Sequence, residues 1–143
     1  MSCMGAQQRF WILVVLMALV CSGCDTLHSR QYVVDKASAA DRETIKAAVE
    51  STAMTAGLAD KTETSKVPDT IAFYLEPVPH FPTSLGARLH GDLAIVDLSC
   101  FHPGRKKPAA FKTAESELTE KLGRAFGERL SMPEYPDRVP LRH

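Results

Sequence analysis

The segment Leu93–Phe101 constrains the fold more than any other part of this 143-residue chain. Successive residues of a strand point to opposite faces, so the segment presents two sets of side chains. One set is entirely apolar: Ala94, Val96, Leu98 and Cys100. The other set contains Asp97 and Ser99. The pattern predicts a strand with one face against a core, and it predicts that Cys100 is buried as a small apolar residue.

Two more strands are predicted immediately before this one. Thr70–Glu76 and Ser84–His90 both alternate, and the prolines between them indicate an extended loop. The pair Gly91-Asp92 is typical of the two-residue turn of a hairpin, so the second of these strands should be antiparallel to Leu93–Phe101.

Two helices flank the three strands. Ser38 followed by Asp41 is a capping-box pattern that begins the first helix, and Gly57 is expected to end it as a left-handed C-cap. A second helix is predicted over Pro108–Leu130, with proline at its first position. The apolar stripe of this helix should consist of Phe111, Ala114, Leu118, Leu122, Ala125 and Arg129 or Leu130.

With a short strand candidate at Gln31–Val34, the element order becomes β-α-β-β-β-α. An amphipathic helix has to bury its apolar stripe against the apolar face of a sheet. The sequence therefore predicts an α+β fold, a two-layer domain with a mainly antiparallel sheet and both helices on one face.

The start of the chain has the layout of a secretory leader. Arg9 is its one charged residue, and Phe10–Val20 follows without a charge or an amide. The small residues Ser22 and Gly23 then precede Cys24. A charged start, a short apolar stretch and small residues before a cleavage point are typical of an exported protein.

These residues resemble the lipobox of bacterial lipoproteins. The resemblance implies that residues 1–23 are a signal peptide cleaved between Gly23 and Cys24, and that the Cys24 thiol carries the lipid, which includes palmitate. The sequence departs from the family at Cys21, where leucine is most common. Asp25, directly after the modified cysteine, is similar to the residue of enteric lipoproteins that stay at the periplasmic face of the inner membrane; the outer membrane remains the alternative.

Two other interpretations of the leader stay open. An ordinary signal peptide cut near the same place would carry no lipid. An uncleaved anchor would need about 20 apolar residues, whereas the stretch between Phe10 and Asp25 is shorter and contains Ser22 and Gly23.

The remaining chain is divided by composition. We expect residues 24–30 to be a lipidated tether reaching about 20 Å at most, residues 31–130 to be the α+β domain, and residues 131–143 to be a tail that contains prolines. The chain has 17 basic and 17 acidic residues, and loss of Arg9 with the leader would leave a net charge of −1. This balance argues against a nucleic-acid partner, which requires a concentrated basic surface.

Beyond the expected leader, the sequence contains no recognised catalytic or metal-binding motif. His80, His90 and His102 lie near the loops of one hairpin, but their spacing matches no ligand pattern, so we predict no metal and no cofactor. The candidates for a contact surface are Phe81 in the proline-rich loop and the basic residues Arg105, Lys106 and Lys107.

The function predicted from these features is that of a lipid-anchored envelope protein. It would be a non-enzymatic binding or accessory module that contacts the membrane through lipid on Cys24 and binds another envelope protein. The alternative is a periplasmic domain that binds a small ligand or hydrolyses a substrate without a recognisable motif.

Overall fold

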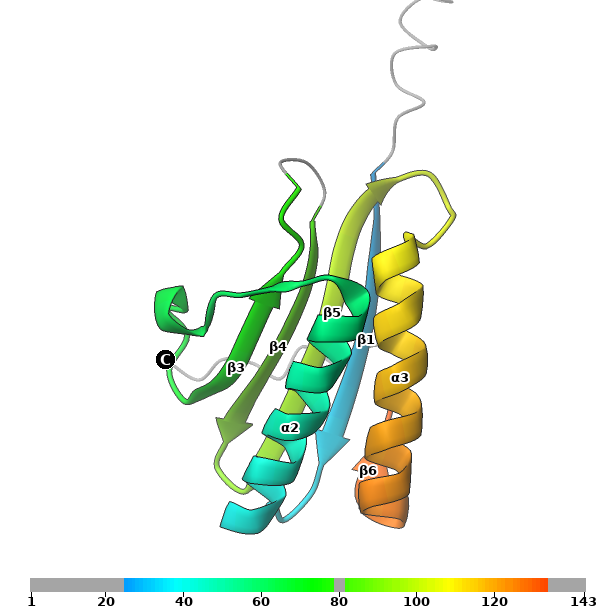
Figure 1. The fold of residues 1–143 in the computed structure, drawn as a ribbon. Coiled ribbons are helices and arrows are strands. Elements are labelled where there is room, and N and C mark those ends of the chain that lie inside the picture. Colours follow the sequence, from blue (N-terminus) through cyan, green and yellow to red (C-terminus); the bar gives the residue numbers. More distant parts are fainter. Residues whose placement is uncertain (1–24, 79–81, 134–143) are drawn as a thin grey trace, which may run out of the picture.

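Every strand in the computed structural model is antiparallel to its neighbours. The structure describes residues 25–78 and 82–133, and within them six strands form one sheet in the order β2-β3-β4-β5-β1-β6 (Figure 1). The strands are β1 (Asp25–Val34), β2 (Ala59–Asp60), β3 (Thr70–Leu75), β4 (Thr83–His90), β5 (Leu93–Pro103) and β6 (Leu130–Ser131).

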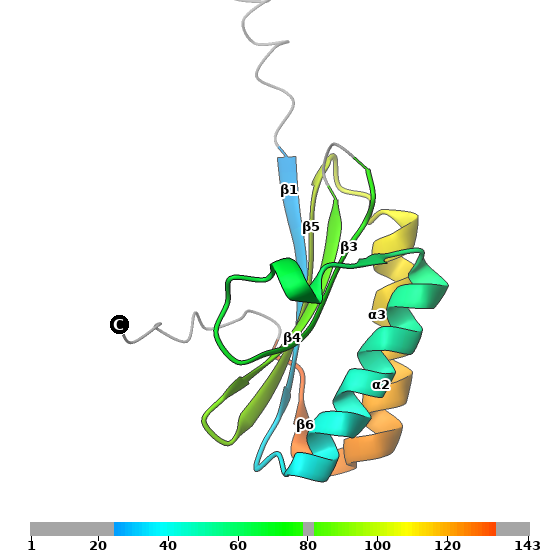
Figure 2. The ribbon, with the colours of Figure 1, turned by 60° about the vertical axis from the view of Figure 1, so that its left-hand side comes forward.

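Two helices, α2 (Ala39–Ala56) and α3 (Ala109–Phe126), cover one face of this sheet. Figure 2 shows both helices on one side, with the segment that carries the 3₁₀ helix η1 (Thr62–Thr64) on the other. The predicted α+β class, with both helices on one face, is therefore confirmed. We call the face that α2 and α3 do not cover the open face.

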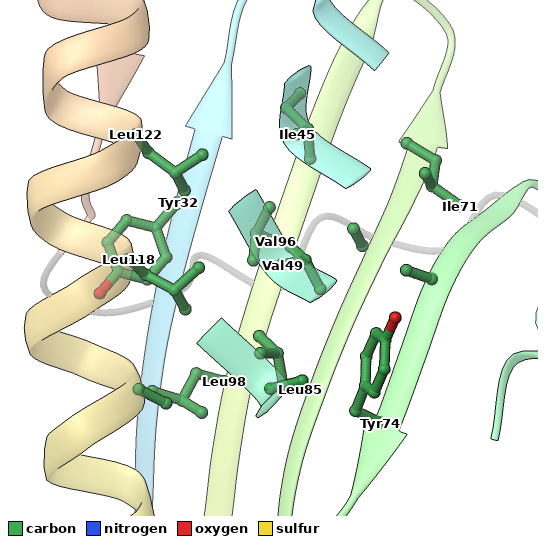
Figure 3. Close-up of a cluster of buried hydrophobic side chains, with 14 of the residues drawn as sticks. Tyr32, Ile45, Val49, Ile71, Tyr74, Leu85, Val96, Leu98, Leu118 and Leu122 are labelled. Carbon is green, nitrogen blue, oxygen red and sulfur yellow. The ribbon is translucent and has the colours of Figure 1, made fainter. Parts of the chain in front are cut away.

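The core lies between the helices and the sheet and is assembled from the alternating residues predicted for β5. Cys100 is 1% exposed, and its register neighbour on β4 is Thr83. Tyr32 on β1 is completely buried, and its hydroxyl donates a hydrogen bond to the backbone carbonyl of Glu115 on α3, 3.0 Å away. Figure 3 shows the main contributors: Tyr32, Ile45, Val49, Ile71, Tyr74, Leu85, Val96, Leu98, Leu118 and Leu122.

Helix α2 begins and ends where the sequence predicts. The Ser38 hydroxyl accepts a hydrogen bond from the backbone N–H of Asp41, and the Asp41 carboxylate accepts one from the backbone N–H of Ser38. Gly57 has a φ of 73°, a conformation that glycine adopts without a steric penalty. The next residue, Leu58, folds back over the helix end and is buried.

Helix α3 differs from the prediction at both ends. Pro108 is the N-cap and not the first helical residue, and the helix ends at Phe126 because Gly127 has a φ of 51°. The 3₁₀ helix η2 (Gly127–Arg129) follows. The predicted stripe was wrong at Ala125, which is exposed; Phe126 is buried in its place.

Strand β1 corrects the prediction of a tether. The strand begins at Asp25, which pairs with Pro103, and continues to Val34, which pairs with Ala94. Residues 25–30 are therefore part of the sheet and not a linker. These residues form a strand because each of them pairs with a residue of β5. The sequence of Asp25–Arg30 itself has no apolar alternation.

Two short strands were also not predicted. In β2, Ala59 pairs with Leu75, in the connection between α2 and β3. In β6, Leu130 pairs with Val34, at the junction of the predicted helix and tail. Residues 134–143 lie outside the described part of the chain.

Candidate functional site

Asp97 is the central polar residue of the open face. Its Oδ1 accepts a hydrogen bond of 2.7 Å from Nε2 of Gln31 on β1. Its Oδ2 lies 3.3 Å from Nη2 of Arg88 on β4, and both side chains of this ion pair are more than one-third exposed. Because both carboxylate oxygens are engaged, Asp97 holds the side chains of Gln31 and Arg88 in position.

A hollow lies beside this polar group. Gly86, the register neighbour of Asp97, leaves space that a side chain would fill, since a Cβ there would lie 3.4 Å from Cδ2 of Phe73. The volume of the hollow is about 140 Å³. Its floor includes Ser84 and Ser99, whose hydroxyl oxygens are 2.8 Å apart. The lining residues are Ser65, Val67, Thr70, Ala72, Phe73, Ser84, Gly86, Ala87, Arg88, Asp97 and Ser99.

The size of the hollow limits what it can hold. Pockets for drug-sized ligands usually measure about 300–1,000 Å³, whereas an engineered cavity of about 150 Å³ binds benzene. At about 140 Å³, the hollow fits one ring-sized or branched group. A single side chain of a partner protein matches this volume. It would contact the apolar lining residues Val67, Ala72, Phe73 and Ala87 together with the hydroxyls and the ion pair.

A second surface lies where β1 begins and β5 ends, at the top of Figure 1. Leu27 and Phe101 are register neighbours across β1 and β5 and remain 53% and 57% exposed. The loop after β5 adds Arg105 and Lys106, both exposed. Val78, on the connection between β3 and β4, is 44% exposed, and β4 begins at this end because Thr83 pairs with Cys100. We call the surface formed by Leu27, Val78, Phe101, Arg105 and Lys106 the basic end.

Lys107 differs from the two cations before it. Its Nζ lies 2.7 Å from Oε2 of Glu115 on α3, in an ion pair. The same Nζ lies 5.3 Å from the centre of the Phe111 ring. Lys107 is therefore engaged with α3, whereas the ion pairs of the described residues include neither Arg105 nor Lys106.

The other residues singled out in the sequence are distributed as follows. Cys24, Gly23 and Phe81 lie outside the described residues, and Asp25 is the first residue of β1. Arg105, Lys106 and Lys107 form an exposed loop, as predicted.

The histidines do not converge on one site. His90 ends β4 beside the Gly91-Asp92 turn, whereas His102 lies near the other end of β5. His80 is outside the described residues. Within residues 25–78 and 82–133, no group of three histidine, cysteine or acidic side chains is close enough to hold a metal ion.

The hollow was not foreseen in the sequence. Its polar group comes from three different strands, Gln31 on β1, Arg88 on β4 and Asp97 on β5. The signal that could have found it is Asp97 itself, an acidic residue inside an otherwise apolar run, opposite a glycine in the predicted hairpin.

Comparison of the chain with protein-family models, with curated proteins and with solved structures finds no match. Among the helices of the described residues, none combines the length and the apolar character needed to cross a bilayer.

Proposed function

We propose that this protein is a lipid-anchored module of a bacterial envelope that binds another envelope protein through its open face. Cys24 carries the lipid, and the folded domain begins with the next residue, Asp25. Binding, and not catalysis, is the role of the domain. The membrane favoured by Asp25 is the inner one, with the domain on its periplasmic side.

The observation that carries the binding role is the hollow beside Gly86. A volume of about 140 Å³ suits one anchoring side chain of a protein partner. It is below the range in which small ligands are usually enclosed. The Arg88–Asp97 ion pair at the edge of the hollow is partly exposed. Polar groups of the partner can replace the water around this ion pair.

A cross-linking pulldown from membranes tests this role. Gly86→Val fills the hollow without a strained backbone, since valine suits a strand. Gly123→Ala on α3 is the matched control, because a Cβ at this position meets nothing within 4 Å. We expect one stoichiometric envelope protein with the natural chain and with Gly123→Ala, and its loss with Gly86→Val at an unchanged melting temperature.

Two results would contradict the binding role. Retention of the same partner by folded Gly86→Val would exclude the hollow as the contact. A small molecule that remains in the purified domain and is displaced by Gly86→Val would favour the ligand-binding alternative.

Metabolic labelling with palmitate tests the anchor. We expect incorporation to require Cys24 and to survive Cys21→Ala, because the lipobox-like residues Ser22 and Gly23 precede Cys24. Labelling that depends on Cys21 and persists in Cys24→Ala would show that the cleavage site is misassigned.

A further inference from the structure

We propose that the basic end docks on an anionic phospholipid surface, with Leu27 and Phe101 in the head-group layer and Arg105 and Lys106 on lipid phosphates. The inference rests on the proposed lipid anchor at Cys24. It goes further because it fixes the orientation of the domain and assigns a second, non-covalent contact with the membrane.

The first support is the absence of a linker between the anchor and the sheet. Strand β1 starts at Asp25, one residue after Cys24. A strand rises about 3.3 Å per residue, so Leu27, three residues after Cys24, lies at most about 10 Å further along the chain than the lipidated residue. A bilayer of about 40–45 Å around a hydrocarbon core of about 30 Å has head-group layers roughly 5–8 Å thick. A lipid on Cys24 thus keeps Leu27 within reach of the head groups.

The second support is the exposure of apolar side chains at this end. Leu27 and Phe101 are opposite each other on β1 and β5, and each is more than half exposed. Register neighbours of this kind have Cβ atoms about 5 Å apart, so the two side chains form one apolar patch. Val78, on the β3–β4 connection at this end, adds a third exposed apolar side chain. Bulky apolar side chains next to cations are typical of surfaces that insert into a membrane interface.

The third support is charge. Arg105 and Lys106 are exposed on the loop that follows β5, and the ion pairs of the described residues do not include them. Two of the acidic residues near this end are engaged: Glu115 pairs with Lys107, and Glu76 accepts a hydrogen bond from the backbone N–H of Thr83. A third acidic residue, Asp25, is the register neighbour of Pro103. The two cations are therefore available to lipid phosphates. Each basic residue at an anionic surface strengthens binding about fivefold.

A tryptophan probe tests the orientation in the full lipidated chain. Trp11 is the one tryptophan of the sequence and belongs to the expected leader, so the processed protein would contain none. Phe101→Trp introduces a probe at the basic end. His90→Trp is the control, because this exposed residue lies beside the β4–β5 turn at the opposite end of the sheet. Both variants are reconstituted in vesicles of phosphatidylglycerol and phosphatidylcholine that carry bromine on their acyl chains.

We expect strong quenching of the tryptophan at position 101 and little at position 90. In Arg105→Gln/Lys106→Gln, the ratio of docked to undocked protein should fall about fivefold for each cation removed. Arg42→Gln/Lys46→Gln on α2 removes the same charge from exposed sites and should leave the quenching unchanged.

Two results would overturn the inference. One is equal quenching at positions 101 and 90. The other is quenching at position 101 that does not change when Arg105 and Lys106 are replaced. Mass spectrometry of the N-terminal peptide separates this failure from that of the proposed function. A Cys24 without lipid would overturn the anchor and the docking together. A lipidated Cys24 with no quenching at position 101 would overturn the docking alone.

Discussion

At the scale of single residues, Cys100 illustrates how burial controls reactivity. Its side chain faces α2 and α3 with Val96 and Leu98, and it is 1% exposed. Burial raises the pKa of the Cys100 thiol, although a hydrogen bond with Thr83 acts in the opposite direction. Both low exposure and a small thiolate fraction slow reactions with electrophiles.

We therefore expect Cys100 to react slowly with a water-soluble maleimide in the folded protein and rapidly in denaturant. Ser116→Cys provides a control thiol on the exposed side of α3. Peptide mass spectrometry after timed labelling measures both sites. Labelling of Cys100 at the rate of the thiol at position 116, without denaturant, would contradict the register of β5.

Tyr32 combines apolar packing with one polar contact. Its hydroxyl lies 3.0 Å both from the carbonyl oxygen of Glu115 and from Oγ1 of Thr119. The Glu115 carbonyl also accepts a hydrogen bond of 2.7 Å from the Thr119 hydroxyl. Removing the Tyr32 hydroxyl therefore leaves that carbonyl with a partner.

For this reason Tyr32→Phe should lower the free energy of unfolding by only about 1 kcal/mol. Tyr32→Ala also removes the ring and should cost about 3–5 kcal/mol, as for other large aromatic residues. Urea unfolding curves measure both values. Equal losses for the two variants would mean that the hydroxyl, and not the ring, supplies the stability.

At the scale of elements, one ion pair connects the start of α2 with η2, the 3₁₀ helix that follows α3. Arg129 Nη2 lies 2.8 Å from Oδ2 of Asp41, the carboxylate that also completes the α2 capping box. The backbone N–H of Ser38 is the main cause that holds the pKa of Asp41 below its ordinary value, and Arg129 is the second. A lowered pKa in the folded state means that the charged carboxylate stabilises the fold.

This contribution is fully present above about pH 5 and is lost as the pH falls below about 4, through the lowered pKa of the folded state. The melting temperature of the natural chain should therefore exceed that of Asp41→Asn at pH 6, and the difference should shrink toward pH 2. Glu63→Gln, on the exposed helix η1, is a control expected to show no such difference. A difference between the natural chain and Asp41→Asn that is independent of pH would exclude a charge effect.

The elements that could be predicted from the sequence are those whose pattern is local. The β4–β5 hairpin and α2 have alternation, a turn pair, a capping box and a C-cap glycine within their own residues. Strand β1 has none of these in Asp25–Arg30, because it places His28 and Arg30 on the same face as Tyr32 and forms by pairing with β5. Register between distant strands is not visible in a single sequence, so its first six residues were predicted as a tether.

The same reason explains the outcome for the sites. Arg105 and Lys106 are neighbours in the chain, and their exposure was predicted. The hollow depends on Gly86 facing Asp97, which follows from the predicted hairpin, and on Gln31 reaching Asp97 from β1, which only the sheet order brings about. At the end of α3, a four-residue step from Leu122 to Phe126 continues the stripe, whereas the prediction took a three-residue step to Ala125.

At the scale of the whole molecule, the proposed anchor and the proposed binding face are compatible. Strand β1 has ten residues and therefore rises about 33 Å away from the lipid on Cys24. With the basic end on the bilayer, the strands extend away from the membrane. The open face is then roughly perpendicular to the plane of the membrane. The hollow beside Gly86 then lies above the head groups, where an envelope protein can reach it.

If Cys24 carries the proposed lipid, we expect Asp25 to decide in which membrane the protein resides. In the enteric lipoproteins that this leader resembles, aspartate directly after the modified cysteine is associated with retention at the inner membrane. Here the same residue begins β1 and pairs with Pro103, so its backbone is held in the sheet close to the proposed lipid. We expect density-gradient fractions of native membranes to contain the protein with inner-membrane markers, and Asp25→Ser to move it toward the outer membrane. Asp92→Ser, in the turn at the far end of the sheet, should leave the distribution unchanged. Recovery chiefly with outer-membrane markers, unaltered by Asp25→Ser, would contradict retention at the inner membrane. The proposed lipid anchor would then stand, but Asp25 would not determine the membrane.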